Sequence, residues 1–289
     1  MFRVDLIKYF TEVRLLTSNT NRYDFFKILF YIYEMIKVSI LGAGNLGSHL
    51  FNNFIKIENI EVTQWYNRSL KSIEQHKNKV RITNKIEELT EADVYLLCLS
   101  DDILPTIATQ LIALKGVIAH TAGSVSINIL KGIKNHGVFY PLQTFSKSIP
   151  VPLNNIPICI EGNNNYSREI LNSLAKHISH NIKLINTKQR LGLHTAAVFV
   201  NNFTNYMYQI GGEICEKQQV SFNMLMPLIK ETARKIEIAS PKKVQTGPAL
   251  RNDQSTIQKH LSLLSNPAFK DLYLTLTDSI QKNNEQSKL

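Results

Sequence analysis

Apolar and polar positions follow two different rhythms along this chain. Between about residue 36 and residue 185, short apolar or alternating runs of strand length recur between segments with helical spacing, whereas the later part shows helical spacing only. The strand-like runs cover residues 37–41, 60–66, 80–83, 92–99, 116–120, 156–161 and 182–185. Strands that alternate with helices predict a mostly parallel sheet, so we expect an α/β domain followed by an all-helical domain.

The helical segments give the predicted domain boundaries. We expect helices over residues 166–179, 188–210, 223–238, 253–264 and 267–282, with Thr187 as the cap of the second of these. The chain then divides into an N-terminal extension over residues 1–34, an α/β domain over residues 35–187 and a helical domain over residues 188–289.

The first strand runs directly into a glycine-rich turn, G-A-G-N-L-G. Gly42 allows the tight turn, Gly44 lets the backbone approach a pyrophosphate, and Gly47 lets the next helix pack close to the strand. That helix begins at Asn45 and Leu46, where free N–H groups and the helix dipole favour an anion. The alternative is a chance glycine turn, but the strand before it and the helix after it predict a doubly wound (Rossmann) domain that binds a dinucleotide.

The end of the second strand predicts which dinucleotide binds. NAD-binding domains place an acidic residue there to hold the ribose 2′-hydroxyl, but this chain has Asn67, Arg68 and Ser69. A guanidinium and a hydroxyl match a 2′-phosphate through charge-assisted hydrogen bonds, which favours NADP over NAD. Alternatively, Arg68 is only a solvated loop charge.

Polar residues also follow two later strands, where ligands of open α/β sheets bind. Ser100 and Asp101 should border the cofactor ribose, although Asp101 could equally cap the next helix. His120 and Ser124 lie in the small-residue turn H-T-A-G-S, where a nicotinamide ring would lie. His120 is a candidate catalytic contact or a strand-end histidine bonded to backbone.

The long helix that starts near Thr187 carries a polar stripe. At 100° per residue, His194, Asn201 and Asn205 lie within about 20° of one another on an otherwise apolar helix. Such a stripe lines either a wet cleft or a structural hydrogen-bond network. In a cleft, His194 is the best proton donor, because histidine side chains ionise near neutral pH.

The polar loop over residues 245–253, Q-T-G-P-A-L-R-N-D, is unusual for a mere helix connector. Arg251 is our candidate for an anionic substrate group, whereas Asp253 is predicted to cap the following helix. We expect no metal site, since the histidines have no ligand spacing with acids or cysteines.

Composition describes an ordinary globular protein of 289 residues, with 44% hydrophobic and 19% charged residues. The net charge of +10 comes from lysines scattered along the sequence, which favours no nucleic-acid face. Three distant cysteines predict neither disulfides nor zinc and fit a cytoplasmic protein. The apolar run at residues 25–33 is too short to span a membrane, and we expect Met35 to be the natural start or residues 1–34 to be dispensable.

Five motifs carry a resemblance that covers residues 35 to about 281. These are G-A-G-N-L-G, H-T-A-G-S, G-V-F-Y-P-L-Q-T-F-S, L-H-T-A-A-V-F-V-N-N-F-T-N and Q-T-G-P-A-L-R-N-D. With them the chain resembles a family of bacterial Rossmann-like NADP-dependent oxidoreductases whose C-terminal half is a domain of unknown function (DUF 2520). At fold level it is similar to pyrroline-5-carboxylate reductase, prephenate dehydrogenase and the 6-phosphogluconate dehydrogenase group. The resemblance implies a helical domain that dimerises and closes the active site.

The leading hypothesis is an NADP-dependent reductase or dehydrogenase that transfers a hydride to or from a small C=O or C=N compound that carries a carboxylate. The alternative is a non-catalytic NADP-binding protein, such as a sensor, because fold alone never establishes catalysis. The apolar residues lie on more than one face of the later helices, which predicts a homodimer built through the helical domain. We expect a small-molecule substrate and neither a nucleic-acid nor a membrane partner.

Overall fold

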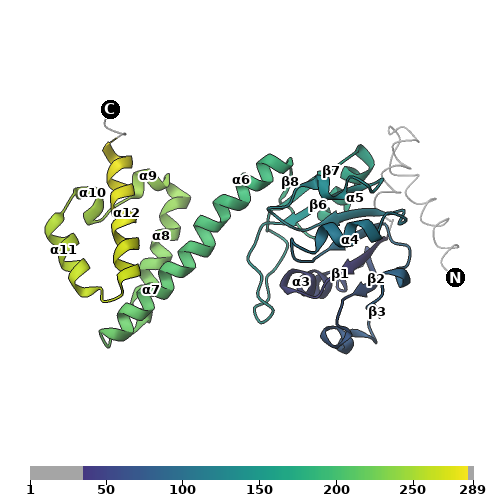
Figure 1. The fold of residues 1–289 in the computed structure, drawn as a ribbon, viewed down its shortest axis with the longest axis horizontal. Helices are drawn as coiled ribbons and strands as arrows, with labels where there is room; N and C mark the ends of the chain where they lie inside the picture. Colours follow the sequence, from purple (N-terminus) through teal and green to yellow (C-terminus); the bar gives the residue numbers. More distant parts are fainter. Residues whose placement is uncertain (1–34, 286–289) are drawn as a thin grey trace, which may run out of the picture. The chain divides into compact units, whose positions relative to one another are not determined.

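The structure, a computed structural model, describes residues 35–285 (Figure 1). The predictions for residues 1–34 lie outside the described residues. The chain divides into two compact units, with the boundary between Ala196 and Ala197. This boundary differs from the predicted one after Thr187, because the first turns of α6 (Thr187–Ala197) bond to the sheet of the first unit.

The described part of the first unit contains an eight-stranded sheet in the order β3-β2-β1-β4-β5-β6-β7-β8. Strands β1 to β6 pair in parallel, β7 is antiparallel to β6, and β8 is parallel to β7. The sheet is therefore mostly parallel, as predicted, and the carboxyl ends of β1, β4, β5 and β6 lie at the same edge. The bounds are β1 (Ile36–Leu41), β2 (Ile60–Tyr66), β3 (Arg81–Thr83), β4 (Val94–Leu97), β5 (Val117–His120), β6 (His136–Pro141), β7 (Ile158–Gly162) and β8 (Ile182–Leu184).

Helices cover both faces of this sheet, which confirms the doubly wound fold (Figure 1). On one face, α3 (Asn45–Phe54) and α5 (Asn165–Lys176) pack in one apolar cluster with Val38 and Ile40 of β1. On the other face, α4 (Leu104–Gln110) packs in a second cluster with Leu41. Successive side chains of a strand point to opposite faces, so a strand covered on both sides must be apolar throughout, as β4 is.

Short 3-10 helices replace longer elements in several connections. They are η1 (Leu70–Ser72), η2 (Glu74–His76), η3 (Ile86–Glu88) and η4 (Ile127–Leu130). The connection from β2 to β3 contains only η1 and η2.

The start of α6 differs from the prediction in one detail. The capping side chain is that of Asn186, whose Oδ1 accepts the N–H of Gln189 at 2.9 Å, while the Gln189 side chain accepts the N–H of Asn186 at 2.9 Å. This reciprocal pair satisfies two donors at the helix end, as in a capping box. Thr187 is the first helical residue instead, and its N–H and hydroxyl both donate to Glu161.

The described part of the second unit is helical, as predicted, but its first helix is not regular. Residues 198–203 form a π-helical stretch, η5, between α6 and α7, so the helix is not the uninterrupted α-helix that the sequence predicted. Two short helices, α9 and α10, lie where the sequence predicted connecting loop. The bounds are η5 (Val198–Phe203), α7 (Thr204–Lys217), η6 (Phe222–Leu225), α8 (Met226–Ile238), α9 (Pro241–Val244), α10 (Pro248–Arg251), α11 (Gln254–Leu263) and α12 (Pro267–Glu285).

One histidine of the first unit, His120 at the end of β5, is fully buried in the core. Its Nδ1 accepts the N–H of Ala122 at 3.3 Å. Burial, assisted by the nearby charge of Arg190, lowers the pKa of His120 to about 3, and a backbone contact with Ser126 offsets this only in part. His120 is therefore neutral in the folded protein at physiological pH.

This burial predicts acid sensitivity. An unfolded histidine has a pKa of about 6.5, so as the pH falls the unfolded state binds the proton first. Folding stability should therefore decrease from about pH 6.5 down to the folded pKa of about 3, by up to about 1.4 kcal/mol per pH unit from this residue. Urea unfolding at several pH values should give a flatter pH dependence for His120→Asn than for the unaltered protein. The exposed His180→Asn is the control, and identical slopes for both variants would contradict the prediction.

Candidate cofactor and active site

Two glycines of the turn after β1 are required by the packing of the protein itself. Gly42 has a φ of +112°, and a Cβ added to it would lie 2.2 Å from the carbonyl oxygen of Cys98. A Cβ on Gly47 would lie 2.3 Å from the carbonyl oxygen of Gly42. Any side chain at either position would push α3 away from the ends of β1 and β4, as the sequence predicted for a close helix–strand approach.

Gly44 is different, because the protein gives no reason for its lack of a side chain. Its φ is −68°, and a Cβ added to it would meet no protein atom within 4 Å. The helix that follows has no side-chain cap and no acidic residue in its first turn. The N–H groups at Asn45, Leu46 and Gly47 therefore have no intrahelical acceptor and favour an anion. These residues fit a dinucleotide pyrophosphate, with Gly44 as the point of close approach.

The corner after β2 lies beside this turn. The Asn67 side chain accepts the N–H of Ala43 at 3.1 Å and donates to the carbonyl of Ser69 at 2.8 Å, so Asn67 links the corner to the glycine turn. Arg68 and Ser69 are exposed, and Arg68 makes no hydrogen bond or ion pair with any residue that the structure describes. Asn67 thus holds Arg68 and Ser69, the residues predicted to bind the 2′-phosphate, next to the predicted pyrophosphate site.

The ends of β4 and β5 are joined by a hydrogen bond between two predicted residues. The Ser124 hydroxyl donates to the carboxylate of Asp101. The alternative that Asp101 caps the next helix is wrong, because Ile103 is the N-cap of α4 and no side chain caps it. Ser100 is also exposed, and its hydroxyl bonds to Asp102, which lowers the pKa of that carboxyl.

A tyrosine and a histidine meet at the same edge. The hydroxyl of Tyr140, near the end of β6, lies 3.0 Å from Nδ1 of His194 on α6. Their rings are 6.0 Å apart at 75°, an edge-to-face arrangement. Gly123 makes this approach possible, since a Cβ on it would lie 2.5 Å from His194 Nδ1 and 2.9 Å from Tyr140 Cζ. Three separate segments of the first unit therefore build this pair.

Burial keeps the Tyr140 side chain protonated. It raises the pKa of Tyr140 to about 12, so the side chain is a neutral phenol at physiological pH. The phenol O–H can donate to Nδ1 of a neutral imidazole, and in this arrangement the ring proton is on Nε2. Because Nδ1 packs against Tyr140 and Gly123, Nε2 lies on the opposite side of the ring, away from both.

Tyr140 is a residue that the sequence analysis missed. It appeared only within the motif G-V-F-Y-P-L-Q-T-F-S, outside the predicted strands, and only the need of a buried phenol for a hydrogen-bond partner could have indicated a site. His120, by contrast, is a candidate whose neutral, buried ring bonds to the backbone of Ala122, as its alternative interpretation expected.

Three further candidates lie in the second unit. Asn201 and Asn205 are exposed, and their side chains make no hydrogen bond with described residues, so the described part forms no structural network there. The π-helical stretch also changes the angular spacing that the stripe with His194 assumed. Arg251 is exposed at the end of α10, and Asp253 caps α11 by accepting the N–H of Thr256 at 3.1 Å, as predicted. The catalytic roles of Asn201, Asn205 and Arg251 stay predictions.

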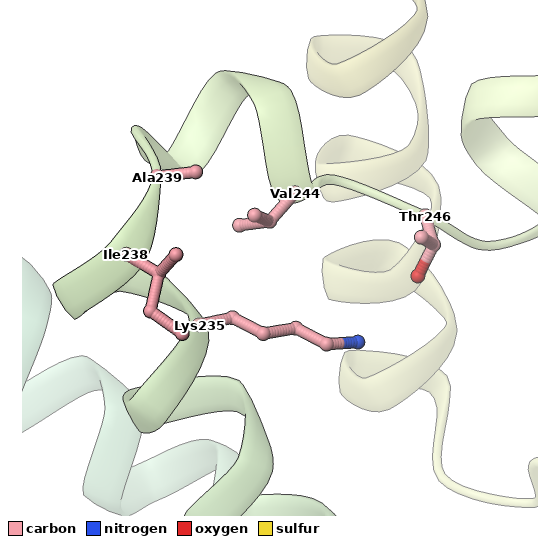
Figure 2. A pocket seen from close by; sticks show the side chains of 5 residues that line it. All are labelled: Lys235, Ile238, Ala239, Val244 and Thr246. Atoms are coloured by element: carbon pink, nitrogen blue, oxygen red, sulfur yellow. The ribbon is translucent and has the colours of Figure 1, made fainter.

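The second unit also has a shallow, mainly apolar depression of about 290 Å³ between the end of α8 and the segment after α9 (Figure 2). In Figure 2 the Lys235 side chain extends across it toward Thr246. It contains none of the predicted site residues. Its complete lining is Lys235, Ile238, Ala239, Val244 and Thr246.

Among the described residues, no group of three or more histidine, cysteine or acidic side chains is arranged to hold a metal ion. No helix in that part of the chain combines the length and apolar character needed to cross a bilayer.

Comparison with known proteins assigns the chain to a family. Residues 37–123 match the family described as NADP oxidoreductase coenzyme F420-dependent, and residues 156–280 match a domain of unknown function, DUF2520. A crystal structure from Bacteroides fragilis, described as an NADP oxidoreductase, is 34% identical, with 86% of this chain and 98% of that chain covered and a TM-score of 0.79. The chain belongs to the NADP oxidoreductase family. This confirms the family and the cofactor class, NADP, that the sequence predicted.

Two more distant structures share the fold of this NADP oxidoreductase. A pyrroline-5-carboxylate reductase from Coxiella burnetii is 13% identical, with 88% of this chain and 98% of that chain covered and a TM-score of 0.51. An imine reductase from Myxococcus stipitatus in complex with NADP⁺ is 13% identical, with 87% and 93% covered and a TM-score of 0.60. The predicted fold-level similarity to pyrroline-5-carboxylate reductase is confirmed. No curated protein matches the sequence.

The glycine geometry predicts opposite outcomes for two alanine variants. Gly44→Ala should leave the free energy of unfolding within about 1 kcal/mol of the unaltered value but weaken NADPH binding by roughly tenfold or more. Gly42→Ala should cost about 2 kcal/mol or more, from the left-handed backbone and the overlap with Cys98. Urea unfolding and a fluorescence titration with NADPH measure both effects. Equal NADPH affinity of Gly44→Ala and the unaltered protein would contradict the pyrophosphate assignment.

The corner after β2 predicts the preference between cofactors. NADPH should bind more tightly than NADH, and Arg68→Ala should weaken NADPH binding by roughly tenfold to a hundredfold, because a charge-assisted hydrogen bond contributes about 1.5 to 3 kcal/mol. NADH affinity should be nearly unchanged. Arg81→Ala, at the exposed start of β3, is the matched control for lost positive charge. Equal binding of NADPH and NADH to the unaltered protein would refute the assignment of Arg68.

Proposed function

We propose that this protein is an NADP-dependent reductase or dehydrogenase that transfers a hydride to or from a small C=O or C=N compound. The observation that carries the proposal is the Tyr140–His194 pair, which lies at the edge formed by the carboxyl ends of the parallel strands. Ligands of open α/β sheets bind at this edge. The glycine turn that fits the pyrophosphate ends there too.

The pair supplies the proton that such a reaction needs. NADPH, when bound, supplies the hydride to the carbon of the C=O or C=N group. The electron pair of the double bond then moves to the oxygen or nitrogen, which takes a proton from Nε2 of the imidazolium form of His194. The neutral ring that remains keeps its other proton on Nδ1, where the phenol oxygen of Tyr140 accepts it, and Nε2 is protonated again from solvent; Tyr140 stays a phenol throughout.

The hydrogen bond to Asp101 leaves Ser124 able to act toward a ligand only as a hydrogen-bond acceptor. Its hydroxyl proton is directed to the Asp101 carboxylate, so the lone pairs of its oxygen remain free to accept a hydrogen bond from cofactor or substrate. A carboxylate on the substrate would need a cation, for which Arg251 is our candidate. The names of two similar folds, pyrroline-5-carboxylate reductase and imine reductase, support a C=N substrate as the first class to test.

The proposal predicts unequal losses of activity. His194→Gln should lower kcat by about a hundredfold or more, since positioned acid–base groups contribute about 10² to 10⁴, and Tyr140→Phe should have a smaller effect. NADPH affinity should change little in both variants. The assay follows loss of NADPH absorbance with a panel of cyclic imines, 2-oxo acids and coenzyme F420, and the exposed His180→Gln is the control.

Two results would count against this function. Full activity of His194→Gln on any panel member would remove the proton-donor role. NADPH binding without turnover of any panel member by the unaltered protein would favour the alternative of a non-catalytic NADP-binding protein, in which the pair is structural.

We also propose that the protein is a homodimer built through its helical unit. Six large apolar side chains of that unit are each at least 62% exposed, which is far more apolar surface than a lone helical unit ordinarily presents. They are Phe199, Val200, Met224, Leu228, Ile238 and Leu263. A two-fold interface that pairs the same helices is the simplest cover for them.

The dimer predicts a mass near twice the 33.0 kDa of one chain in light scattering at micromolar concentration. Phe199→Lys combined with Leu228→Lys should shift the mass toward one chain, because an interface tolerates buried unpaired charges poorly. A mass near 33.0 kDa for the unaltered protein would end the dimer proposal.

A further inference from the structure

A buried arginine lies one helical turn before His194. Arg190 on α6 is 1% exposed, and its guanidinium donates to the carboxylate of Glu161 on β7 and to the carbonyl of Val125. Glu161 also accepts the N–H and the hydroxyl of Thr187, each at 2.9 Å. The first two turns of α6 are therefore bonded both to the sheet and to the loop after β5.

The bonds of Arg190 end beside the parts that form the active pair. Residues four apart on a helix lie on one face, so Arg190 and His194 share the face of α6 that is turned to the sheet. Val125 is two residues after Gly123, against which His194 packs. The guanidinium thus ties the helix that carries the imidazole to the loop that the imidazole contacts.

The other end of the network lies next to Tyr140. Glu161 on β7 is paired with Val138 on β6, and Tyr140 is two residues further along β6, on the same face of that strand. One guanidinium therefore fixes α6 against both the loop of Gly123 and the strand of Tyr140. It links all three segments that build the pair.

Stability alone does not account for this arrangement. A buried ion pair is often no more stabilising than apolar side chains of the same size, because its desolvation offsets the attraction. Nε of Arg190 is buried without a hydrogen-bond partner among the described residues, which adds to the cost. The planar guanidinium instead offers directional bonds that an apolar contact cannot supply.

We propose that Arg190, held by Glu161, is a positioning residue that keeps the imidazole of His194 bonded to the Tyr140 hydroxyl, with Nε2 directed away from it. The inference rests on the proposed function of the pair. It adds that Arg190, one turn earlier on the same face of α6, sets the orientation of His194. It identifies Arg190 and Glu161 as residues on which the reaction depends without contact to the substrate.

The test uses nitrogen NMR of the full-length protein labelled at histidine, with the His194 signals assigned through His194→Gln. Tyr140→Phe defines the change in the Nδ1 resonance when the phenol bond is lost. Arg190→Lys keeps the positive charge but cannot bond to both Glu161 and Val125 as the planar guanidinium does. It should therefore reproduce most of that change in the Nδ1 resonance. Adding Tyr140→Phe to Arg190→Lys should then produce little further change. Lys188→Met, exposed on the same helix, is the matched control and should leave the resonance unaltered.

A purely structural role gives a different result. Arg190→Lys and Glu161→Gln would then lower the melting temperature while the Nδ1 resonance of His194 stayed at its unaltered position, which would overturn the proposal. Glu161→Gln removes only the charge at nearly constant shape, so it gives the same decision if Arg190→Lys is unstable. The NMR result is independent of turnover. Failure of the proposed function in the activity assay is therefore distinguishable from failure of this inference.

Discussion

The architecture of the first unit depends on a backbone contact that only glycine permits. At Gly42 and Gly47, an added Cβ would lie closer than 2.5 Å to a carbonyl oxygen, so α3 can lie against the ends of β1 and β4 only without side chains there. Trp65 donates from Nε1 to the carbonyl of Gly42 at 2.9 Å, and Asn67 accepts the N–H of Ala43 at 3.1 Å. Contacts with β2, with the end of β4 and with α3 therefore all hold the glycine turn in place. What this leaves facing outward is the backbone at Gly44 and the uncapped start of α3, and a fixed row of N–H donors needs no rearrangement to bind a phosphate.

The sequence predicted the parts of the fold whose causes are local. A glycine turn, its strand and its helix are contiguous, and each glycine has a short-range reason, so the order of elements was sufficient to infer the cofactor class. The register that places Tyr140 opposite His194 is not local, because it depends on the pairing of β6 with both β5 and β7 and on the packing of α6 against these strands. No helical or strand periodicity contains that information. The same limit explains the wrong cap at Thr187, whose hydroxyl bonds to Glu161, 26 residues away in sequence, and the missed π-helical stretch that the 100° spacing excluded.

Several predicted cofactor contacts have partners inside the protein. Asn67 bonds to Ala43 and Ser69, and Asp101 accepts the hydroxyl of Ser124. The sequence identifies the chemistry of a side chain and the edge at which it lies, but a polar group at a strand end can serve a ligand or a neighbouring strand equally well. These bonds join the ends of β1 with β2 and of β4 with β5. They make the edge a rigid platform, and rigid placement of polar groups is what a reacting pair requires.

Two histidines at this edge differ in burial and in hydrogen bonding, although their side chains are identical. His120 ends β5 inside the core, where burial lowers its pKa to about 3 and its Nδ1 is used by the backbone of Ala122. His194 is only partly buried and bonds through Nδ1 to a phenol that burial keeps protonated. Arg190 acts on both, because its charge disfavours protonation of His120 while its bonds hold the helix of His194. Burial, assisted by this cation, thus keeps the inner ring neutral, and the same cation ties the helix of the outer ring to the edge, where we propose that its imidazole exchanges a proton with a substrate.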